Sequence, residues 1–363
     1  MAFKPKRAGT PPHATPIDSR TGADKWKLSS QLQKAIRHGM RDEAMVAAQD
    51  LAKIEPSYLR YRLAVIAMED VGAGSPDVVL ETLGPGWKKA EVEARGGEGV
   101  VMETVERFVV ATKDRTPCDL MYATRFVPEF EAIHGPWGDL TWDKGHALAM
   151  DPAQPWWARA LGAWRCAGTD KFQARTEILP RVAGDWDRWV AANGEAFGES
   201  AAKLMRIGEF QREHHHVFIG LALGANQRPD ASTIDGTPPD LPKLGYWLSA
   251  AIDKHTADGK RALGILLGMN PDGAGALAQY GLDREAQTDL VGRLWFWREG
   301  SECSSKRTHA LAQAIHPDNQ AKVLGPVPRQ VLEDAFGDTS LWQQARAQAL
   351  GLAPAPNRGF RRS

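Results

Sequence analysis

The sequence predicts an all-α protein, and three observations support that prediction. Apolar residues recur at three- and four-residue spacings far more often than they alternate, a pattern typical of helices. Dipeptides that close tight hairpins are scarce between the apolar segments. The chain has 363 residues, 43% of them hydrophobic, which is enough to fill one large domain or two ordinary ones.

The first helices carry clear start and stop signals. One helix is expected from Leu28 to His38, ended by Gly39, and a second from Asp42 to Lys53. A third is expected to begin at Pro56, because the missing N–H of proline would have no intrahelical partner in a first turn. Further helices are expected at about residues 97–112, 117–127, 154–166, 185–192, 196–224, 282–298, 306–315, 327–336 and 340–350, with another start at Thr256 or Asp258.

Composition divides the chain into six segments. Both ends are basic and rich in proline or small polar residues, so they cannot bury enough apolar surface to offset their ordering entropy. The central proline-, aspartate- and glycine-rich stretch is long for a compact domain, which marks a linker or a functional loop. The expected segments are a disordered basic arm (1–24), a first helical module (25–115), a helical region (116–225), the linker or loop (226–245), a second helical region (246–350) and a basic tail (351–363).

Charge and cysteine usage limit the classes of protein. Lys plus Arg (45) equals Asp plus Glu (45), so any nucleic-acid binding must come from local patches. The neutral balance also argues against a highly acidic DNA mimic. Three widely spaced cysteines without a C-x-x-C motif fit a reducing compartment and give no thiolate metal cluster. The N-terminus lacks the apolar core of a secretion signal, and no later stretch approaches about 18 consecutive apolar residues. We therefore expect a soluble, cytoplasmic protein.

A specific motif runs through the first helical module. It reads SQLQKAIR at residues 30–37, DEA at residues 42–44 and PSYLRYRLAVIAMEDVG at residues 56–72. The order and spacing resemble the segment just after the ATPase core in the replication-associated recombination protein A family, which includes Werner helicase interacting protein. Glu55 and Tyr61 depart from the family pattern. The matching residues are Lys34, Arg37, Tyr58, Arg62, Glu69, Asp70 and Gly72.

The resemblance implies a fold and a context. In that family of clamp-loader-related ATPases, the segment belongs to a helical collar that packs and oligomerises a ring-forming motor, which acts at stalled replication forks with single-strand-binding protein. The implied architecture here is a multi-helix collar-like domain extended by a second helical region. The implied partners are single-strand-binding protein or a clamp loader, single-stranded DNA, and further copies of the chain as an oligomer.

The motor itself is missing from the sequence. A P-loop needs G-x-x-x-x-G-K-[ST] to cradle phosphates, and no such motif occurs in the 363 residues. We therefore expect a non-motor accessory protein of DNA replication or recombination, without a cofactor and without an assigned catalytic residue. A collar that stands alone would suit a phage or another mobile element.

The charged residues of the motif have a structural interpretation of their own. Arg62 precedes Glu69 and Asp70 by about two helical turns, whereas Arg37 comes from another helix. A guanidinium that bridges carboxylates between helices can fix their register. We expect a structural rather than catalytic role for the motif residues Tyr58, Arg62, Glu69, Asp70 and Gly72.

Local basic patches are the candidates for nucleic-acid contact. Two sequences, at residues 155–159 and 295–298, also interleave tryptophan with arginine, as single-strand binders do. Core packing is the alternative explanation for the tryptophans, and the one we favour. The candidate basic residues are Lys4, Lys6 and Arg7 in the N-terminal arm, Lys34, Arg37 and Arg41 in the first module, Lys306 and Arg307, and Arg361 and Arg362 in the tail.

Two other classes of function remain open. Glu131 with His134, and Glu213 with His216, have the Glu-x-x-His spacing found in some dimetal sites of helical bundles. Ten histidines among many acidic residues produce such spacings by chance, so we assign no metal. Residues 253–261 could bind phosphate at a helix N-terminus in an enzyme with a phosphorylated substrate, although a simple helix cap explains them as well. The third class is a purely structural helical scaffold.

Overall fold

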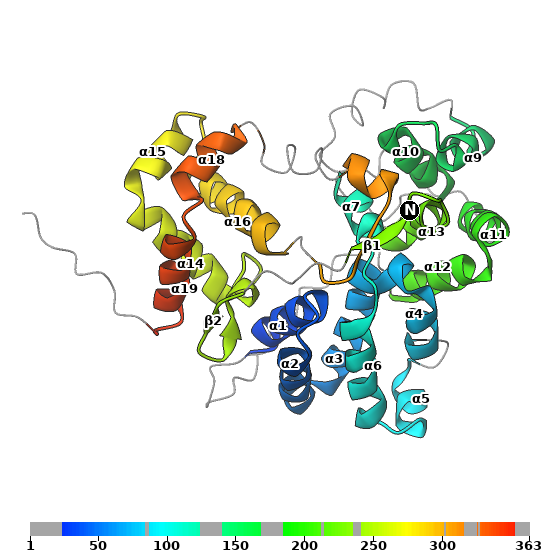
Figure 1. Ribbon diagram of the computed structural model, residues 1–363, viewed down its shortest axis with the longest axis horizontal. Coiled ribbons are helices and arrows are strands. Elements are labelled where there is room, and N and C mark those ends of the chain that lie inside the picture. The colour runs from blue at the N-terminus through cyan, green and yellow to red at the C-terminus, as the bar shows by residue number, and fades with distance from the viewer. Residues whose placement is uncertain are drawn as a thin grey trace, which may run out of the picture.

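The computed structural model describes residues 24–83, 87–123, 140–167, 184–211, 214–234, 241–300, 303–315, 325 and 327–352. Within these residues the protein is all-α, as predicted, and its strands are short, paired two by two (Figure 1). None of the described helices is both long and apolar enough to cross a membrane. The predicted arm and tail lie almost wholly outside the described residues.

The N-terminal helices follow the predicted order. Asp24 caps the first helix by accepting hydrogen bonds from the N–H groups of Trp26 and Lys27, and Gly39 follows its end with φ +71°, a left-handed conformation that suits glycine. The third predicted helix changes to a π-helical turn before Gly72. The elements are α1 (Lys25–Arg37), α2 (Arg41–Ile54), α3 (Pro56–Ile66), the π-helix η1 (Ala67–Val71), the 3₁₀-helix η2 (Gly72–Gly74), α4 (Pro76–Leu83), α5 (Lys89–Ala94) and α6 (Glu98–Val110).

The single helix predicted at 196–224 is wrong, because the chain folds back within it. His216 packs against Gly208 so closely that a Cβ on that glycine would lie 2.3 Å from the Cβ of His216. A 3₁₀ turn therefore separates two helices. The elements of this region are α7 (Thr116–Ala123), α9 (Trp142–Met150), α10 (Trp156–Ala167), α11 (Asp185–Phe197), α12 (Glu199–Gln211), η4 (His214–Phe218) and α13 (Ile219–Asn226).

The helix predicted at 306–315 is also partly wrong. Residues 306–308 form a strand that pairs antiparallel with residues 232–234, and only residues 310–315 are helical. The remaining elements are β1 (Ser232–Ile234), β2 (Lys243–Leu244), β3 (Trp247–Leu248), η5 (Ser249–Ala251), α14 (Ala257–Met269), α15 (Pro271–Ala278), α16 (Arg284–Gly300), β4 (Lys306–Thr308), α18 (Arg329–Phe336) and α19 (Thr339–Ala349).

The described helices pack around two hydrophobic cores. The first core extends from Leu28 to Ile252 and also includes Leu311 and Ile315. The second is built by α14, α15, α16, α18 and α19. The buried residues of the first core therefore stop at Ile252 and resume at Leu311 and Ile315, and the partly buried Leu350 packs against the same core. The change of core comes later than the linker expected at 226–245, within which β2 already contributes to a hairpin with β3.

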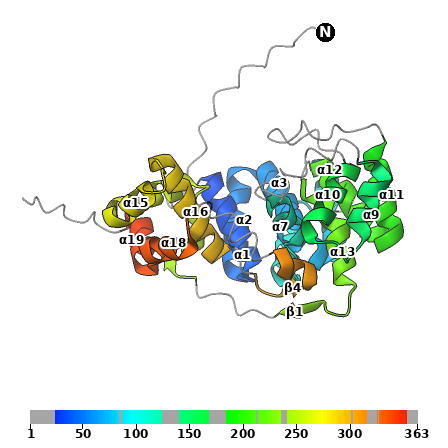
Figure 2. The ribbon, with the colours of Figure 1, turned by 90° about the horizontal axis from the view of Figure 1, so that it is seen from above.

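Helix α1 lies between the two groups of helices in both views (Figure 2). Every residue from Lys27 to Arg37 is buried as a result. Its polar side chains bind the second half of the chain: Gln31 accepts a hydrogen bond of 2.9 Å from the N–H of Leu248, and Lys27 forms an ion pair of 2.7 Å with Asp258. The second of these contacts, between Lys27 and Asp258 on α14, is a polar link from α1 to the second group of helices.

Candidate functional site

A cavity of about 580 Å³ lies beside α1 and reaches α3, η1, α7, η4 and the segment before α14. Its wall is mixed in character, because charged side chains and aromatic rings both line it. The Lys and Arg residues of the wall are Lys34, Arg37, Arg62, Arg115 and Lys254; the acidic ones are Glu69, Asp119 and Asp253; the aromatic ones are Trp26, Tyr58, Phe296 and Trp297.

Asp70 organises the buried charges behind this wall. Its carboxylate accepts hydrogen bonds from Arg37 Nε at 2.8 Å, from Arg115 and from Gln33 Nε2 at 3.0 Å. The side chain of Asp70 is completely buried. Burial alone would raise its pKa, but Arg37 and Arg115 hold the pKa well below its usual value. One ionised carboxylate thus joins α1, η1 and the start of α7.

The π-helical turn brings two acidic neighbours to one partner. Consecutive residues of an α-helix point about 100° apart, yet Gln33 Nε2 reaches both Asp70 and Glu69 Oε2, the latter at 2.5 Å. Gly72 follows the turn with φ +29°. Such π-helical turns often occur at functional sites, and this one presents Glu69 to the cavity.

Arg62 is linked to these carboxylates through Gln33. It donates a hydrogen bond from Nη2 to Gln33 Oε1, so the predicted bridge between Arg62 and the two acids runs through an amide. Burial would raise the pKa of Glu69, but His215 and Arg62 together lower it. The motif residues Arg37, Arg62, Glu69 and Asp70 are therefore gathered at one wall of the cavity.

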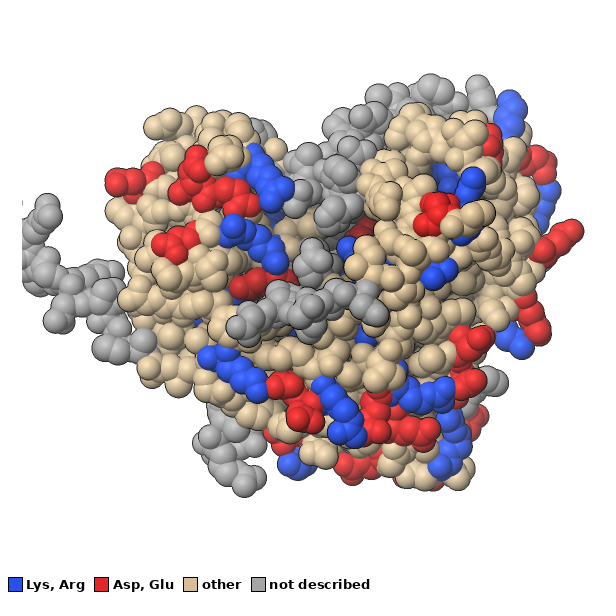
Figure 3. Space-filling model, viewed as in Figure 1, with Lys and Arg blue, Asp and Glu red and all other residues tan. Residues whose placement is uncertain are grey.

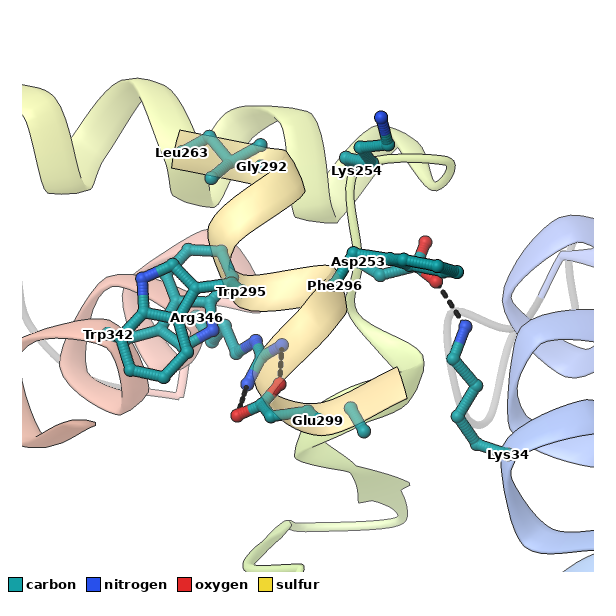
Figure 4. A pocket seen from close by; sticks show the side chains of 11 residues that line it. Lys34, Asp253, Lys254, Leu263, Gly292, Trp295, Phe296, Glu299, Trp342 and Arg346 are labelled. Atoms are coloured by element: carbon teal, nitrogen blue, oxygen red, sulfur yellow. Dashed lines mark hydrogen bonds and ion pairs between the residues drawn. The ribbon is translucent and has the colours of Figure 1, made fainter. Parts of the chain in front are cut away.

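Asp253 holds in place the segment before α14, which forms another part of the cavity wall. Its carboxylate forms an ion pair with Lys34 across the gap between the two groups of helices (Figure 4). It also accepts hydrogen bonds from Ser30 Oγ at 3.3 Å and from the N–H of His255 at 2.9 Å. Burial would raise the pKa of Asp253, but the Lys34 ammonium brings it below its usual value.

The segment considered for phosphate binding, residues 253–261, is used internally. Thr256 caps α14 by accepting a hydrogen bond of 3.0 Å from the N–H of Gly259. Asp258 binds both Lys27 and Arg261. Of the two predicted helix starts, Thr256 and Asp258, the structure has the first, with Thr256 as the N-cap. The polar groups around it hold α14 against α1.

A second ion pair fixes the position of α19 and α16. Arg346 binds Glu299 through two nitrogens, at 2.9 and 2.5 Å, donates from Nε to the carbonyl oxygen of Ile252 at 3.0 Å, and lies 4.2 Å from the ring centroid of Trp342 (Figure 4). His38 hydrogen-bonds the backbone oxygen of Glu299 at 3.1 Å. Burial and the nearby Arg37 lower the pKa of His38 to about 4.

An aromatic ladder of Trp26, Tyr58 and Tyr61 begins at the rim of the cavity, which its first two rings line. Trp26 and Tyr58 meet edge to face with ring centroids 5.7 Å apart, and Tyr61 follows Tyr58 at 6.0 Å. Lys25 Nζ lies 5.5 and 5.1 Å from the first two rings. Trp26 is 52% exposed and Tyr61 46%, which is unusual for rings of this size.

The basic residues proposed for nucleic-acid contact are dispersed. Lys34 and Arg37 are buried in the ion pairs described above, and Arg307 donates to the side-chain and backbone oxygens of Asn226, both at 3.0 Å. Lys306 is half-buried in β4. Arg41 is exposed and paired with Glu106. Lys4, Lys6, Arg7, Arg361 and Arg362 lie outside the described residues.

The face seen in Figure 3 has mixed charge. Over the edge that carries α2, α5 and α6, Lys and Arg side chains alternate with Asp and Glu. Two ion pairs here are Arg41 on α2 with Glu106 on α6, and Arg107 on α6 with Glu81 on α4. No broad basic patch appears among the described residues of this edge.

The metal candidates are described only in part. Glu131, His134 and Glu213 lie outside the described residues, whereas the ring of His216 packs edge-on against Trp186 with centroids 4.6 Å apart. Among the residues the structure describes, no group of three or more His, Cys, Asp or Glu side chains is arranged to hold a metal ion.

Sequence reasoning missed the consecutive charged residues Lys113, Asp114 and Arg115. All three are buried, although a charged run normally indicates a solvated loop. Asp114 accepts hydrogen bonds from Asn226 at 2.8 Å and from the N–H of Thr116 at 2.9 Å. The sequence feature that could have indicated their burial is their position between the apolar end of α6 and Pro117.

No protein-family model, curated protein or solved structure matches this chain. The fold and the site therefore define it only as an all-α protein with a polar, aromatic-rimmed cavity beside the helix that separates its two cores.

Proposed function

We propose that this chain is a non-motor accessory protein of DNA replication or recombination that binds single-stranded DNA or a replication protein. The observation that carries the proposal is one hydrogen-bonded cluster: Gln33 binds Arg62, Glu69 and Asp70, and Arg37 joins the cluster through Asp70. These residues belong to the motif that resembles the recombination-ATPase collar. Their convergence gives the spacing of that motif a physical reason, because Arg37 comes from α1, Arg62 from α3, and Glu69 and Asp70 from η1, so their hydrogen bonds hold three elements in register.

The aromatic ladder supports the DNA branch of the proposal. Proteins that bind single strands combine stacking platforms with cationic side chains. Here Lys25 lies near the rings of Trp26 and Tyr58, and these two rings line the same cavity as Arg62. The proposed protein partners are single-strand-binding protein and a clamp loader. The lack of a P-loop in the 363 residues is the reason for proposing a binding role rather than a motor.

The test uses the full chain in two binding measurements. Fluorescence anisotropy with a labelled single-stranded oligonucleotide should show binding that weakens as salt rises, because phosphate contacts release counterions. Pull-down assays with purified single-strand-binding protein and clamp loader measure the protein branch. Binding in either assay supports the proposal, and failure in both overturns it.

A structural scaffold is the second candidate, and the internal pairing of Lys34, Arg37 and Arg307 favours it. A scaffold would need none of its basic residues for partner contact. If the chain is a scaffold, deleting residues 1–23 and 353–363 should leave the binding of a protein partner intact. If those segments contact phosphates of DNA, the same deletion should clearly weaken DNA binding.

A further inference from the structure

We propose that the cavity beside α1 binds a nucleoside phosphate, with the base on the Trp26–Tyr58 rim and the phosphate beside Arg62. The inference deepens the proposed function and rests on its DNA branch. The same chemistry has two sources, a free nucleotide and the terminal nucleotide of a single strand, and the experiment below separates them.

The size of the cavity fits this ligand class. Small-molecule sites usually measure about 300 to 1,000 Å³, and this cavity has about 580 Å³, which is enough for one nucleotide. The mixture of rings and charged groups also fits, because a nucleotide joins a flat base to a strongly anionic phosphate.

The distribution of charge singles out Arg62 as the phosphate partner. Two acidic residues of the wall have partners, since Asp253 binds Lys34 and Glu69 accepts from Gln33. Behind the wall, Asp70 lies between Arg37 and Arg115. Arg62 by contrast hydrogen-bonds only the neutral amide oxygen of Gln33, and its Nε has no acceptor among the described residues. A guanidinium of this kind can take a phosphate through two nitrogens.

The aromatic rim supplies the second half of the site. Trp26 lines the cavity and is 52% exposed, so one side of its ring is available for stacking. Tyr58 lines the same cavity, edge-on to Trp26. Stacking on aromatic side chains recognises any base, so the site should tolerate different bases while requiring the phosphate.

Isothermal titration calorimetry with the full chain tests the proposal. The probes are dAMP, deoxyadenosine, and a short single-stranded oligonucleotide with and without a 5′-phosphate. The variants are Trp26→Ala and Arg62→Gln, each expected to weaken binding about tenfold or more. The matched controls are Tyr280→Ala, an aromatic residue 41% exposed outside the cavity, and Arg284→Gln, an exposed arginine on α16; both should leave affinity unchanged.

Each outcome has a defined meaning. Binding of dAMP but not deoxyadenosine, weakened by both variants, supports the site with a free nucleotide as its ligand. Binding that requires the phosphorylated oligonucleotide supports it with a strand end. Arg62 also holds Gln33, so a folding defect in Arg62→Gln would leave Trp26→Ala, a change at an exposed ring, as the deciding variant.

Two results would overturn the inference. The first is nucleotide binding that persists unchanged in Trp26→Ala, which would place the ligand elsewhere. The second is failure of every probe to bind. If pull-down of single-strand-binding protein or clamp loader succeeds despite that failure, the proposed function stands without this site; if the pull-down also fails, both are overturned.

Discussion

Arg37 Nε lies 2.8 Å from Asp70 Oδ1, and both side chains are almost completely buried. The carboxylate also binds Arg115, so one negative charge faces two positive ones. Removing the carboxylate would leave two guanidinium groups buried without compensation, which is far more costly than losing an exposed ion pair.

Asp70→Asn should lower the free energy of unfolding by about 3 to 5 kcal/mol. Asparagine keeps the size of the side chain but lacks the charge. Urea denaturation at neutral pH measures the loss. The matched control is Glu106→Gln, which removes the partner of the exposed Arg41 and should cost less than about 1 kcal/mol. Similar losses in the two variants would contradict the dominant role of the buried cluster.

His38 should make stability depend on pH in the mildly acidic range. Its pKa falls from 6.5 to about 4 on folding, so the unfolded chain takes up a proton more readily than the native protein does. The neutral His38 ring therefore contributes its full stability above pH 6.5. As pH falls toward 4, the free energy of unfolding should decrease by about 3 kcal/mol.

Comparison with His38→Gln isolates this contribution. Glutamine can still donate to the backbone oxygen of Glu299 but does not titrate. Urea denaturation from about pH 7 to about pH 4 should show a smaller decline in the variant than in the unmodified protein. Parallel declines would mean that other groups cause the pH dependence.

Two glycines of α14 should respond oppositely to alanine. A Cβ at Gly259 would lie 1.7 Å from the backbone oxygen of Asp253, whereas nothing lies within 4 Å of one at Gly264. Gly259→Ala should cost at least about 3 kcal/mol, because rigid backbone must move. Gly264→Ala should stabilise the protein by about 0.5 to 1 kcal/mol through helix propensity. Thermal or urea unfolding checks both, and a neutral Gly259→Ala would contradict the close approach.

Arg346→Lys should destabilise the second core by about 2 to 4 kcal/mol. Lysine keeps the charge but cannot bind Glu299 through two nitrogens while also reaching the carbonyl oxygen of Ile252. The control is Arg284→Lys at the exposed start of α16, expected to change stability by less than about 0.5 kcal/mol. Equal stability of both variants would show that the forked geometry is unimportant.

Local signals predicted the fold class and many helix ends. Asp24, Gly39 and Thr256 act at helix termini by hydrogen bonds or backbone conformation within a few residues, so the start at Thr256 and the stop at Gly39 were readable. The π-helical turn at Ala67–Val71 could not be predicted from the sequence, because it depends on contacts with α1 and α7. Helices α4, α5, α9 and α15 were also not predicted; all are nine residues or shorter.

The site was predictable only where its residues share one motif. Arg37 and Asp70 could be singled out from their spacing, but their pairing with Arg115 depends on the path of the chain after α6. Asp253 reaches Lys34 over 219 residues of sequence. The sequence around Trp26 did not indicate that its ring would be exposed. That exposure depends on how the start of α1 packs against the rest of the protein.

The return of residues 303–315 to the first core has a consequence for how this protein is made. Leu311 and Ile315 complete a core that otherwise ends at Ile252, and β4 supplies the partner of β1. On the ribosome, the N-terminal half must therefore wait, with part of its apolar surface uncovered, until these residues have emerged. Because α14, α15 and α16 are synthesised in that interval, three of the five described helices of the second core precede the residues that complete the first.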